Sequence, residues 1–514
     1  MISKKAVNDF LKRPLDNWYW MKDLKRRQVF DEIVKLAPDF KFKTSPYKHQ
    51  MACFLIGMYN PYFNWHLDMG FGKTKLSLDL IKLRKKRNEK YLILVPSTVS
   101  VTGWINEINI HSDFDAIKVV GSVADREYAL SQDVDLYVMN YDGLQWLLCE
   151  QGTNKKDKGA MLPIEQKIKD FSKLFSGIVM DETHLKGIKN QQSLTWKLCK
   201  AISKNSRFRY GLTGTPMGKD PQDLWPQFYL MDRGETLGET IGLYRQAFFT
   251  SSFGYFGGIE HKFNSKKEKL LHEMIAHRSI RYSEDELSDV PPVVRKNIEV
   301  EFTQEIQAYY NRALNGLREE LKGGFKTLEN GFMKLRQLSS GFLYFKNEKE
   351  RISLDFDPNP KIDALEELLL SIKDEDKVII FCDFIETGNK IEELLNKLKI
   401  MYVRLYGGTK DSDRENAQKL FTNSRHHRVF LANSQSGGTS LNLQVAKYGI
   451  FFESPIDPIT RKQAEKRFTG ARQQHKIAFI YDIIMKDSKD EAILQSIAEG
   501  KSIFDAIIEG KIKL

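Results

Sequence analysis

Two short segments constrain this chain more than any other feature: HLDMGFGKT at residues 66–74 and GIVMDETH at residues 177–184. Gly70 and Gly72 lack Cβ atoms, so the first segment can fold its backbone N–H groups around phosphate oxygens. The generic phosphate-loop pattern has a glycine where this chain has Leu67, so the first segment alone is a weak signal. The second segment adds a pair of carboxylates directly after an apolar run.

The charged and hydroxyl side chains of these segments predict ligands for a nucleoside triphosphate and its metal ion. Lys73 would supply a cation for the terminal phosphates, and Thr74 a hydroxyl ligand for Mg²⁺. Asp181 and Glu182 would lie at the carboxyl end of a buried strand, with Asp181 facing the metal and Glu182 orienting the attacking water. Either half alone could be a structural turn. Together, in this order, they predict a nucleoside triphosphatase.

Length and composition describe an ordinary globular chain. At 514 residues it is too long for one core, so we expect two to four domains. No apolar run has the length of a membrane span, and the N-terminus lacks a signal-peptide pattern. Its four cysteines are scattered in apolar surroundings, which favours buried thiols in a reducing compartment. We therefore expect a cytoplasmic protein, or one in the host cytoplasm if the source is viral.

The balance of charge is basic. A net charge of +11 and a pI near 9.1 favour an anionic partner, with nucleic acid the leading candidate. Two basic clusters, RKKR at residues 84–87 and KKDK at residues 155–158, could contact phosphates. Both are better interpreted as solvated surface, the first at the end of a helix and the second in a polar loop.

Changes in the apolar pattern along the chain predict four segments. Residues 1–43 read as an N-terminal helical segment, and residues 44–223 as a first parallel α/β lobe. Residues 224–356 read as a helical insertion and linker, and residues 357–514 as a second α/β lobe. The predicted strands are YLILVP, LYVMN, GIVMDE and RYGLTGTP in the first lobe, and KVIIFCDF, MYVRLYG, RVFLAN, YGIFFES and IAFIYDII in the second. Ligands of such sheets bind at the carboxyl ends of the strands.

These residues together resemble the Swi/Snf type of superfamily-two helicases, the ATP-driven translocases of double-stranded DNA. The resemblance runs from Ser45 nearly to the end of the chain, and its length favours a compact phage or prokaryotic member. It implies two RecA-like lobes flanking an ATP cleft. The matching segments are SPYKHQ, DMGFGKT, VPSTVSVTGWINEI with Trp104, VMNYDGL, LTGTP, PPVVRKNIEVEFTQEIQAYY, LRQLSSGFLY, LYGGTKDSDRENAQKLF and SGGTSLNLQVAKYGIFFESPIDPITRKQAEKR.

The resemblance implies ATP and Mg²⁺ as cofactors and extends the nucleotide site. Gln50 would read the adenine edge, and the family's own glycine loop accounts for Leu67. In the second lobe, Gln463 and Arg467 would reach the triphosphate across the cleft, with Arg467 as an arginine finger. The residues implied to bind the nucleotide are Gln50, Met69, Gly70, Phe71, Gly72, Lys73 and Thr74.

The same resemblance implies a DNA partner held through its backbone, without reading of sequence. LTGTP would couple the γ-phosphate to DNA contacts. We expect duplex or branched DNA as the partner, no membrane contact and a monomer; the identity of any protein partner is left open. The residues implied to face DNA are Asn140, Tyr141, Thr213, Thr215, Gly408, Thr409, Gly437, Gly438 and Asn442.

The chain departs from the family pattern at two places. Thr183 stands where the family usually has alanine, a small change that should leave the carboxylates in place. The family also spaces two arginines three apart, but Gly470 occupies the second position here and Arg472 follows two residues later. We expect Arg472 to take the second role through a shifted loop, because a guanidinium tolerates such an adjustment. The other reading is that the second finger is missing.

Two competing functions remain open at the level of sequence. One is a strand-separating helicase on single-stranded DNA or RNA, for which FGYF at residues 253–256 is a candidate wedge; a surface hairpin packed on the helical insertion is the plainer interpretation. The other is a nucleotide-gated clamp or switch that binds DNA or a protein. An intact Glu182 argues against the switch, because a switch could lose its general base without harm.

Overall fold

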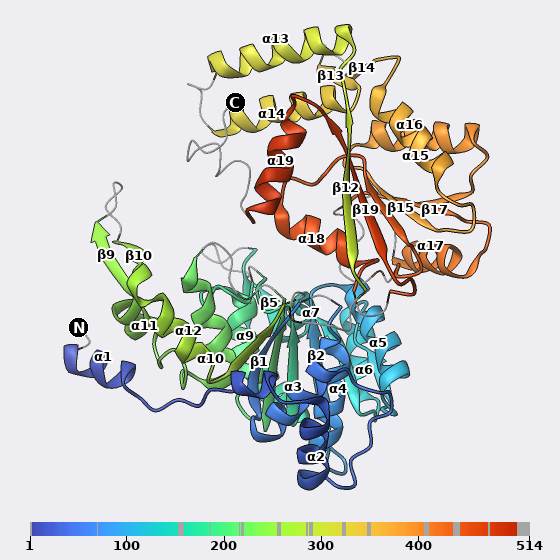
Figure 1. The fold of residues 1–514 in the computed structure, drawn as a ribbon. Coiled ribbons are helices and arrows are strands. Elements are labelled where there is room, and N and C mark those ends of the chain that lie inside the picture. Colours follow the sequence, from blue (N-terminus) through green and yellow to red (C-terminus); the bar gives the residue numbers. More distant parts are fainter. Residues whose placement is uncertain are drawn as a thin grey trace. The chain divides into compact units, whose positions relative to one another are not determined.

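The computed structural model divides the chain into two compact units, residues 1–289 and residues 290–514. Each unit is built around its own parallel sheet with helices packed against it (Figure 1). The residues that the structure describes are 3–68, 70–152, 159–185, 187–214, 216, 220–253, 259–283, 286, 291–320, 325–346, 351–405, 411–434, 441, 443–470 and 473–500.

The first unit contains, within the described residues, a parallel sheet of seven strands. Its central strands are buried along their whole length, as expected when helices cover both faces. Alternate residues enter different cores: Leu92 and Leu94 face one side of the sheet, whereas Tyr91, Ile93 and Val95 face the other. In spatial order the strands are β11 (Ser279–Tyr282), β1 (Tyr62–Leu67), β8 (Phe208–Thr213), β7 (Gly177–Asp181), β2 (Tyr91–Val95), β4 (Leu136–Asn140) and β3 (Ala116–Lys118).

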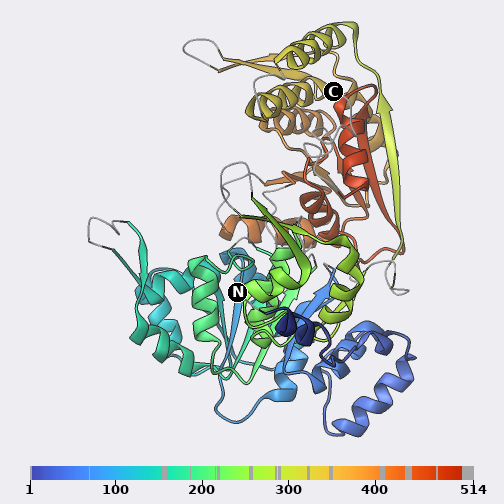
Figure 2. The same ribbon diagram turned by 90° about the vertical axis from the view of Figure 1, so that its left-hand side faces the viewer.

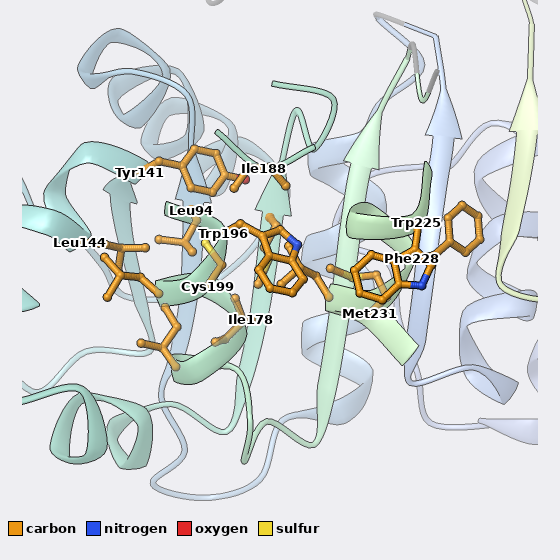
Figure 3. Packing of buried hydrophobic residues seen from close by; sticks show 14 of the residues in the cluster. Leu94, Tyr141, Leu144, Ile178, Ile188, Trp196, Cys199, Trp225, Phe228 and Met231 are labelled. Carbon is orange, nitrogen blue, oxygen red and sulfur yellow. The ribbon is translucent and has the colours of Figure 1, made fainter. Parts of the chain in front are cut away.

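Helices form the two apolar cores of this unit. They are α3 (Lys48–Tyr59), α4 (Lys73–Arg84), α5 (Thr98–His111), α6 (Val123–Ser131), α7 (Tyr141–Leu148), α8 (Glu165–Leu174), α9 (Leu194–Ile202), α10 (Leu224–Asp232), α11 (Ile241–Phe248) and α12 (Glu268–Ile275). One core gathers Trp196 of α9 with Trp225 and Phe228 of α10 (Figure 3). The other includes Phe54 of α3 and Trp104 of α5. The loops at the strand ends are therefore mounted on a rigid, fully packed body.

The N-terminal segment packs on the first unit, as its helical pattern predicts. It contains α1 (Lys4–Leu11), η1 (Tyr19–Lys22) and α2 (Arg26–Leu36). Phe10 of α1 enters one core, and Val29 and Ile33 of α2 enter the other. Trp18 donates a hydrogen bond from its indole Nε1 to the carbonyl of His277 at 3.1 Å, so this aromatic residue is a packing anchor.

The second unit repeats the same architecture with a parallel sheet of six strands in its described part. The long edge strand β12 pairs with β19 over eight residues, which is visible as the extended arrow in Figure 2. In spatial order the strands are β12 (Val293–Val300), β19 (Ala478–Met485), β18 (Tyr448–Phe451), β15 (Val378–Phe381), β17 (Val429–Ala432) and β16 (Tyr402–Leu405). The helices are α13 (Gln304–Glu320), α14 (Phe325–Ser339), α15 (Pro360–Ser371), α16 (Ile385–Lys397), α17 (Asp411–Asn423), α18 (Pro458–Lys466) and α19 (Lys489–Ala498).

Region 224–356, predicted to be a helical insertion and linker, contains helices α10 to α14 and also contributes one edge strand to each sheet. These strands are β11 and β12, and a hairpin of β13 (Phe342–Lys346) and β14 (Arg351–Asp355) follows. The predicted fold class is confirmed in its two parallel α/β lobes, whereas the helical insertion between them stays a prediction. The predicted boundaries of the four segments stay a prediction.

A second hairpin carries part of the predicted wedge. Strands β9 (Phe249–Phe253) and β10 (Ile259–Phe263) pair in antiparallel fashion. Phe249 and Phe263 pack together at its base, but Phe253 is 87% exposed and does not pack on neighbouring helices. The rest of FGYF, residues 254–256, lies outside the described residues.

In the parts of the chain that the structure describes, no helix combines the length and the apolar character needed to cross a bilayer.

Candidate active site

The glycine turn joins the end of β1 to the start of α4. Gly70 and Gly72 adopt φ values of +81° and +73°, a region that favours glycine because it has no Cβ. Gly72 is also the residue that caps α4, so the free N–H groups of the first helical turn open toward this loop. Lys73 begins the helix and donates from Nζ to the carbonyl of Leu67 at 3.0 Å. Thr74, one residue further along the helix, is half-buried, whereas Met69 lies outside the described residues.

Gln50 supports this turn from α3. Its Oε1 accepts a hydrogen bond from the backbone N–H of Tyr47 at 3.0 Å, and its Nε2 donates to the carbonyl of Phe71 at 3.2 Å. A Cβ on Gly72 would lie only 2.0 Å from that Nε2. The amide therefore fixes the shape of the loop. Its predicted contact with adenine stays a prediction.

The Gly72→Ala variant should test the shape of the turn. Alanine at this φ costs about 1–2 kcal/mol and would also collide with the amide of Gln50, so that amide or the loop must shift. We expect affinity for ATP to fall about tenfold or more, measured by titration of a fluorescent ATP analogue. Gly159 has a similar φ of +86° with no atom near its Cβ position, so Gly159→Ala is a matched control that should keep the affinity. Unchanged binding by Gly72→Ala would contradict the assignment.

The acidic pair lies at the end of β7, which neighbours β8 and, through it, β1. Asp181 Oδ2 accepts a hydrogen bond from the indole Nε1 of Trp104 at 2.9 Å, and Tyr141 donates from its hydroxyl to the backbone carbonyl of Asp181 at 2.7 Å. Glu182 follows with a φ of +52°, unusual for a residue with a side chain, and its backbone N–H donates to Asp181 Oδ1 at 3.0 Å. Such strain persists only where surrounding contacts enforce it.

The pKa values of the two carboxylates are shifted in opposite directions. Burial raises the pKa of Asp181 to about 6, and the charge of Glu182 adds to this effect while Lys73 and Trp104 oppose it. Burial also acts to raise the pKa of Glu182, but the charge of Lys73 and a hydrogen bond from His184 outweigh it and hold that pKa below its usual value. Glu182 is therefore the carboxylate that stays ionised and available to accept a proton. Asp181 lacks a compensating cation of its own.

This donor set fits a nucleotide with a magnesium ion. Mg²⁺ is usually held by one or two protein oxygens together with phosphates and water. The hydroxyl of Thr74 and the carboxylate of Asp181 supply such oxygens, and a divalent cation would provide the charge that Asp181 needs. The described residues contain no cluster of three or more His, Cys, Asp or Glu side chains that could hold a metal on their own.

His184 connects the acidic pair to the LTGTP turn. Its Nδ1 lies 3.1 Å from Glu182 Oε2 and 2.9 Å from Thr213 Oγ1. Thr213 is fully buried at the end of β8, and Thr215 lies outside the described residues. Sequence analysis assigned no role to His184 or to the indole of Trp104. His184 lies in the DETH segment and Trp104 in the segment VPSTVSVTGWINEI. Their contacts form only when the chain is folded.

Two residues predicted to face DNA have internal partners here. Asn140 is buried, and its Oδ1 accepts hydrogen bonds from both terminal nitrogens of Arg126 at 3.3 Å. Tyr141 is 5% exposed and donates to Asp181, as described above. Both side chains therefore have a structural role. Their predicted contact with DNA stays a prediction.

The second unit carries the predicted arginine finger on the segment after α18. Arg467 is 9% exposed and donates from Nη2 to the carbonyl of Ser434 at 3.2 Å. Burial, with a further contribution from Arg414, lowers the pKa of Arg467 to about 10. Gln463 is half-buried on α18, and Gly470 has a φ of +109°. The predicted site residues Gly408, Thr409, Gly437, Gly438, Asn442 and Arg472 lie outside the described residues.

Arg461, which sequence analysis did not single out, holds this segment on the sheet. Its Nη2 donates to Asp482 Oδ2 at 2.8 Å, and its Nε donates to Glu465 Oε1 at 2.8 Å. Its guanidinium also lies 3.5 Å from the centre of the Phe451 ring. A buried, fully paired arginine of this kind fixes the start of α18 and hence the position of Arg467 within the second unit.

A parallel sheet with a glycine turn, a lysine and an acidic pair at its strand ends is a phosphate-loop nucleotide-binding fold. The chain matches the SNF2-related domain over residues 47–355 and the helicase conserved C-terminal domain over residues 360–470. It belongs to the SNF2 family.

Curated relatives include eukaryotic and phage proteins. Snf21, a chromatin structure-remodeling complex subunit of Schizosaccharomyces pombe, is 26% identical over 95% of this chain and 40% of its own length. Nuclear protein STH1/NPS1 of Saccharomyces cerevisiae is 25% identical over 88% of this chain and 34% of its own length. This chain therefore spans well under half of these two relatives. The putative protein p41 of Acyrthosiphon pisum secondary endosymbiont phage 1 is 24% identical over 91% of this chain and 98% of its own length.

Among solved structures, the Sulfolobus solfataricus SWI2/SNF2 ATPase core in complex with dsDNA is similar over 92% of this chain and 94% of that chain. The sequence identity is 21% and the TM-score is 0.40.

Proposed function

We propose that this chain is an ATP-dependent translocase of the Swi/Snf type, which couples ATP hydrolysis to movement on duplex or branched DNA. The observation that carries the proposal is the set of Lys73, which follows β1, and Asp181 and Glu182 at the end of β7, with β8 between the two strands, in a chain of the SNF2 family. Lys73 acts on both carboxylates, so the three groups form one electrostatic unit. Remodelling of forks and junctions, or displacement of bound proteins, is the work that such a motor performs.

Each site residue of the first unit has a separate role in ATP hydrolysis. The backbone N–H groups of the glycine turn and the ammonium of Lys73 bind the phosphates. Thr74 and Asp181 would hold Mg²⁺, which would supply positive charge to the phosphate oxygens. Trp104 orients Asp181 through its indole hydrogen bond. Glu182 orients the attacking water and accepts its proton, a role that suits its lowered pKa and its contact with His184.

For the second unit we propose that Gln463 and Arg467 contribute to hydrolysis, with Arg467 as the arginine finger and Arg472 in the second position. An arginine finger stabilises charge on the phosphates in the transition state. Arg461 holds the segment that carries Arg467 on the sheet, which supports a fixed place for Arg467 within the second unit.

DNA is proposed as the partner because the net charge is +11 and because the family motifs implied to face DNA are present. The names of the eukaryotic relatives refer to chromatin remodelling, which is in keeping with this partner. Contacts to the backbone would make binding independent of sequence. We further propose that the protein acts as a monomer in the cytoplasm.

Steady-state ATP hydrolysis should test the function directly. The rate is measured without polymer and with duplex DNA, forked DNA, single-stranded DNA or RNA. We expect duplex or forked DNA to stimulate hydrolysis about tenfold or more. Raising salt from about 50 to about 200 mM should weaken DNA binding more than about tenfold, because phosphate contacts release counterions.

The rate of ATP hydrolysis with each polymer distinguishes the translocase from the two competing functions. Stimulation by single strands or RNA alone would favour a strand-separating helicase instead. Hydrolysis without any response to polymer would point to a protein partner and would contradict the DNA translocase.

A further inference from the structure

The residue after the acidic pair, Thr183, has a specific buried partner. It stands where the family usually has alanine, and its side chain is fully buried. Its Oγ1 donates a hydrogen bond to Oε1 of Gln227 on α10 at 3.0 Å. Alanine at this position would leave that amide oxygen buried without a donor, which is costly. The departure from the family pattern is therefore matched by a residue elsewhere in the first unit.

Gln227 carries the connection on to the LTGTP turn. Its Nε2 donates to the carbonyl of Pro216, the last residue of the turn, at 2.7 Å, and to the carbonyl of Asp223 at 2.8 Å. Because two carbonyls can only accept, the NH₂ group must face them, and Oε1 must face Thr183. Gln227 is 1% exposed, and its amide is fixed on both sides.

The element that carries Gln227 is rigid. Trp225, Phe228 and Met231 of α10 are buried in the apolar core beside Trp196 (Figure 3). A side chain mounted on such a helix keeps its position when a nearby loop moves. A shift at Pro216 therefore strains the hydrogen bonds of Gln227, including the one that it accepts from Thr183.

Two bridges thus join the DETH segment to the LTGTP turn, through the two residues that follow Glu182. One runs from Glu182 through His184 to Thr213. The other runs from Thr183 through Gln227 to Pro216. The first bridge passes through His184, which lies in the DETH segment itself. The second bridge needs both Thr183 and Gln227 of α10.

We propose that Thr183 and Gln227 are positioning residues that hold Glu182 in register with the LTGTP turn, so that DNA binding at the turn is transmitted to ATP hydrolysis. The inference rests on the proposed function, in which this turn couples the nucleotide to DNA. It adds a second connection, specific to a chain with threonine after the acidic pair. Neither residue contacts the reacting atoms.

The test compares ATP hydrolysis with and without saturating duplex DNA in three variants. Thr183→Val removes the hydroxyl at nearly constant volume, Thr183→Ser keeps it, and Gln227→Met removes the amide. The readout is the ratio of the stimulated rate to the DNA-free rate, together with KM for ATP. We expect Thr183→Val and Gln227→Met to lower the ratio about three- to tenfold, the effect of one lost buried hydrogen bond. Thr183→Ser should keep it within about twofold of the parent.

A double-mutant cycle sharpens the result. If the two residues act as one bridge, the double variant Thr183→Val with Gln227→Met should lower the ratio no further than the more severe single variant. Multiplied effects would mean that the residues act separately and would overturn the bridge. If Gln227→Met does not fold, the comparison of Thr183→Val with Thr183→Ser decides alone.

Thr195 offers a matched control for the loss of a buried hydroxyl. It is 8% exposed, lies on α9 in the same unit, and accepts a hydrogen bond from Gln145 Nε2 at 3.1 Å. Thr195→Val should lower the melting temperature much as Thr183→Val does, without changing the ratio. A purely structural role for Thr183 predicts equal losses in both rates, and this outcome, or failure of Thr183→Ser to restore the ratio, would overturn the inference.

The same measurement distinguishes failure of the proposed function from failure of the bridge between Thr183 and Gln227. Parent protein that DNA does not stimulate would overturn the function, and the inference with it. A stimulated parent whose Thr183→Val variant keeps the parental ratio would overturn the inference alone.

Discussion

Glu182→Gln is expected to lower ATP turnover about 10²- to 10⁴-fold while ATP and DNA still bind, because glutamine has the same shape but cannot accept a proton. In the parent, Lys73 and His184 keep Glu182 in its charged form. Removing that charge leaves Lys73 with a single carboxylate, Asp181, so the ammonium is freer to interact with phosphate. Affinity for ATP should therefore be kept or increased, and the nucleotide-bound state should accumulate.

Single-turnover hydrolysis and equilibrium binding of ATP and duplex DNA measure these two effects separately. Glu235→Gln is a suitable control, because Glu235 is an ion-paired carboxylate in the same unit that contacts Arg278 at 2.7 Å, away from the acidic pair. The control should hydrolyse ATP within about twofold of the parent. Parental turnover in Glu182→Gln would mean that another group is the base.

The central strands of both sheets were predictable from sequence because they are buried on both faces and read as short apolar runs. LYVMN, for example, corresponds to β4 and RVFLAN contains β17. Other strands lacked this signal. Strand β1 carries Asn64 and His66 in the core, and these polar residues interrupt its apolar pattern. The edge strand β12 has only half-buried and exposed residues, and the polar run at residues 295–297 interrupts its apolar pattern.

The candidate site, too, could be predicted only in part from sequence. The positions of Lys73, Asp181 and Thr213 at a strand end or helix start could be predicted from sequence, because each lies in a motif. The contacts that orient them could not be assigned. Trp104 reaches Asp181 across 77 residues of chain, and Thr183 reaches Gln227 across 44, so only the folded sheet brings these partners together. Spacing along the chain carries no information about such pairs.

Lys73→Ala should abolish hydrolysis for a different reason, the loss of ATP binding. Lys73 is the first-turn cation of α4, held at the phosphate loop by its hydrogen bond to Leu67. It is also the cation that lowers the pKa of both Asp181 and Glu182. Without it, the pKa of each carboxyl should rise, because two buried carboxylates then face one another with less compensation. The variant loses the phosphate clamp and weakens its base together.

We expect Lys73→Ala to lower turnover about a hundredfold or more and to weaken ATP binding about thirtyfold or more, since removal of one partner of a buried charged contact costs about 2–5 kcal/mol. Isothermal titration with a non-hydrolysable ATP analogue checks the binding loss, which Glu182→Gln should not share. Lys82→Ala is the matched control, because Lys82 lies on the same helix but is exposed and donates to the carbonyl of Lys41. If Lys73→Ala bound ATP as tightly as Lys82→Ala does, the loop at residues 66–74 would not be the phosphate site.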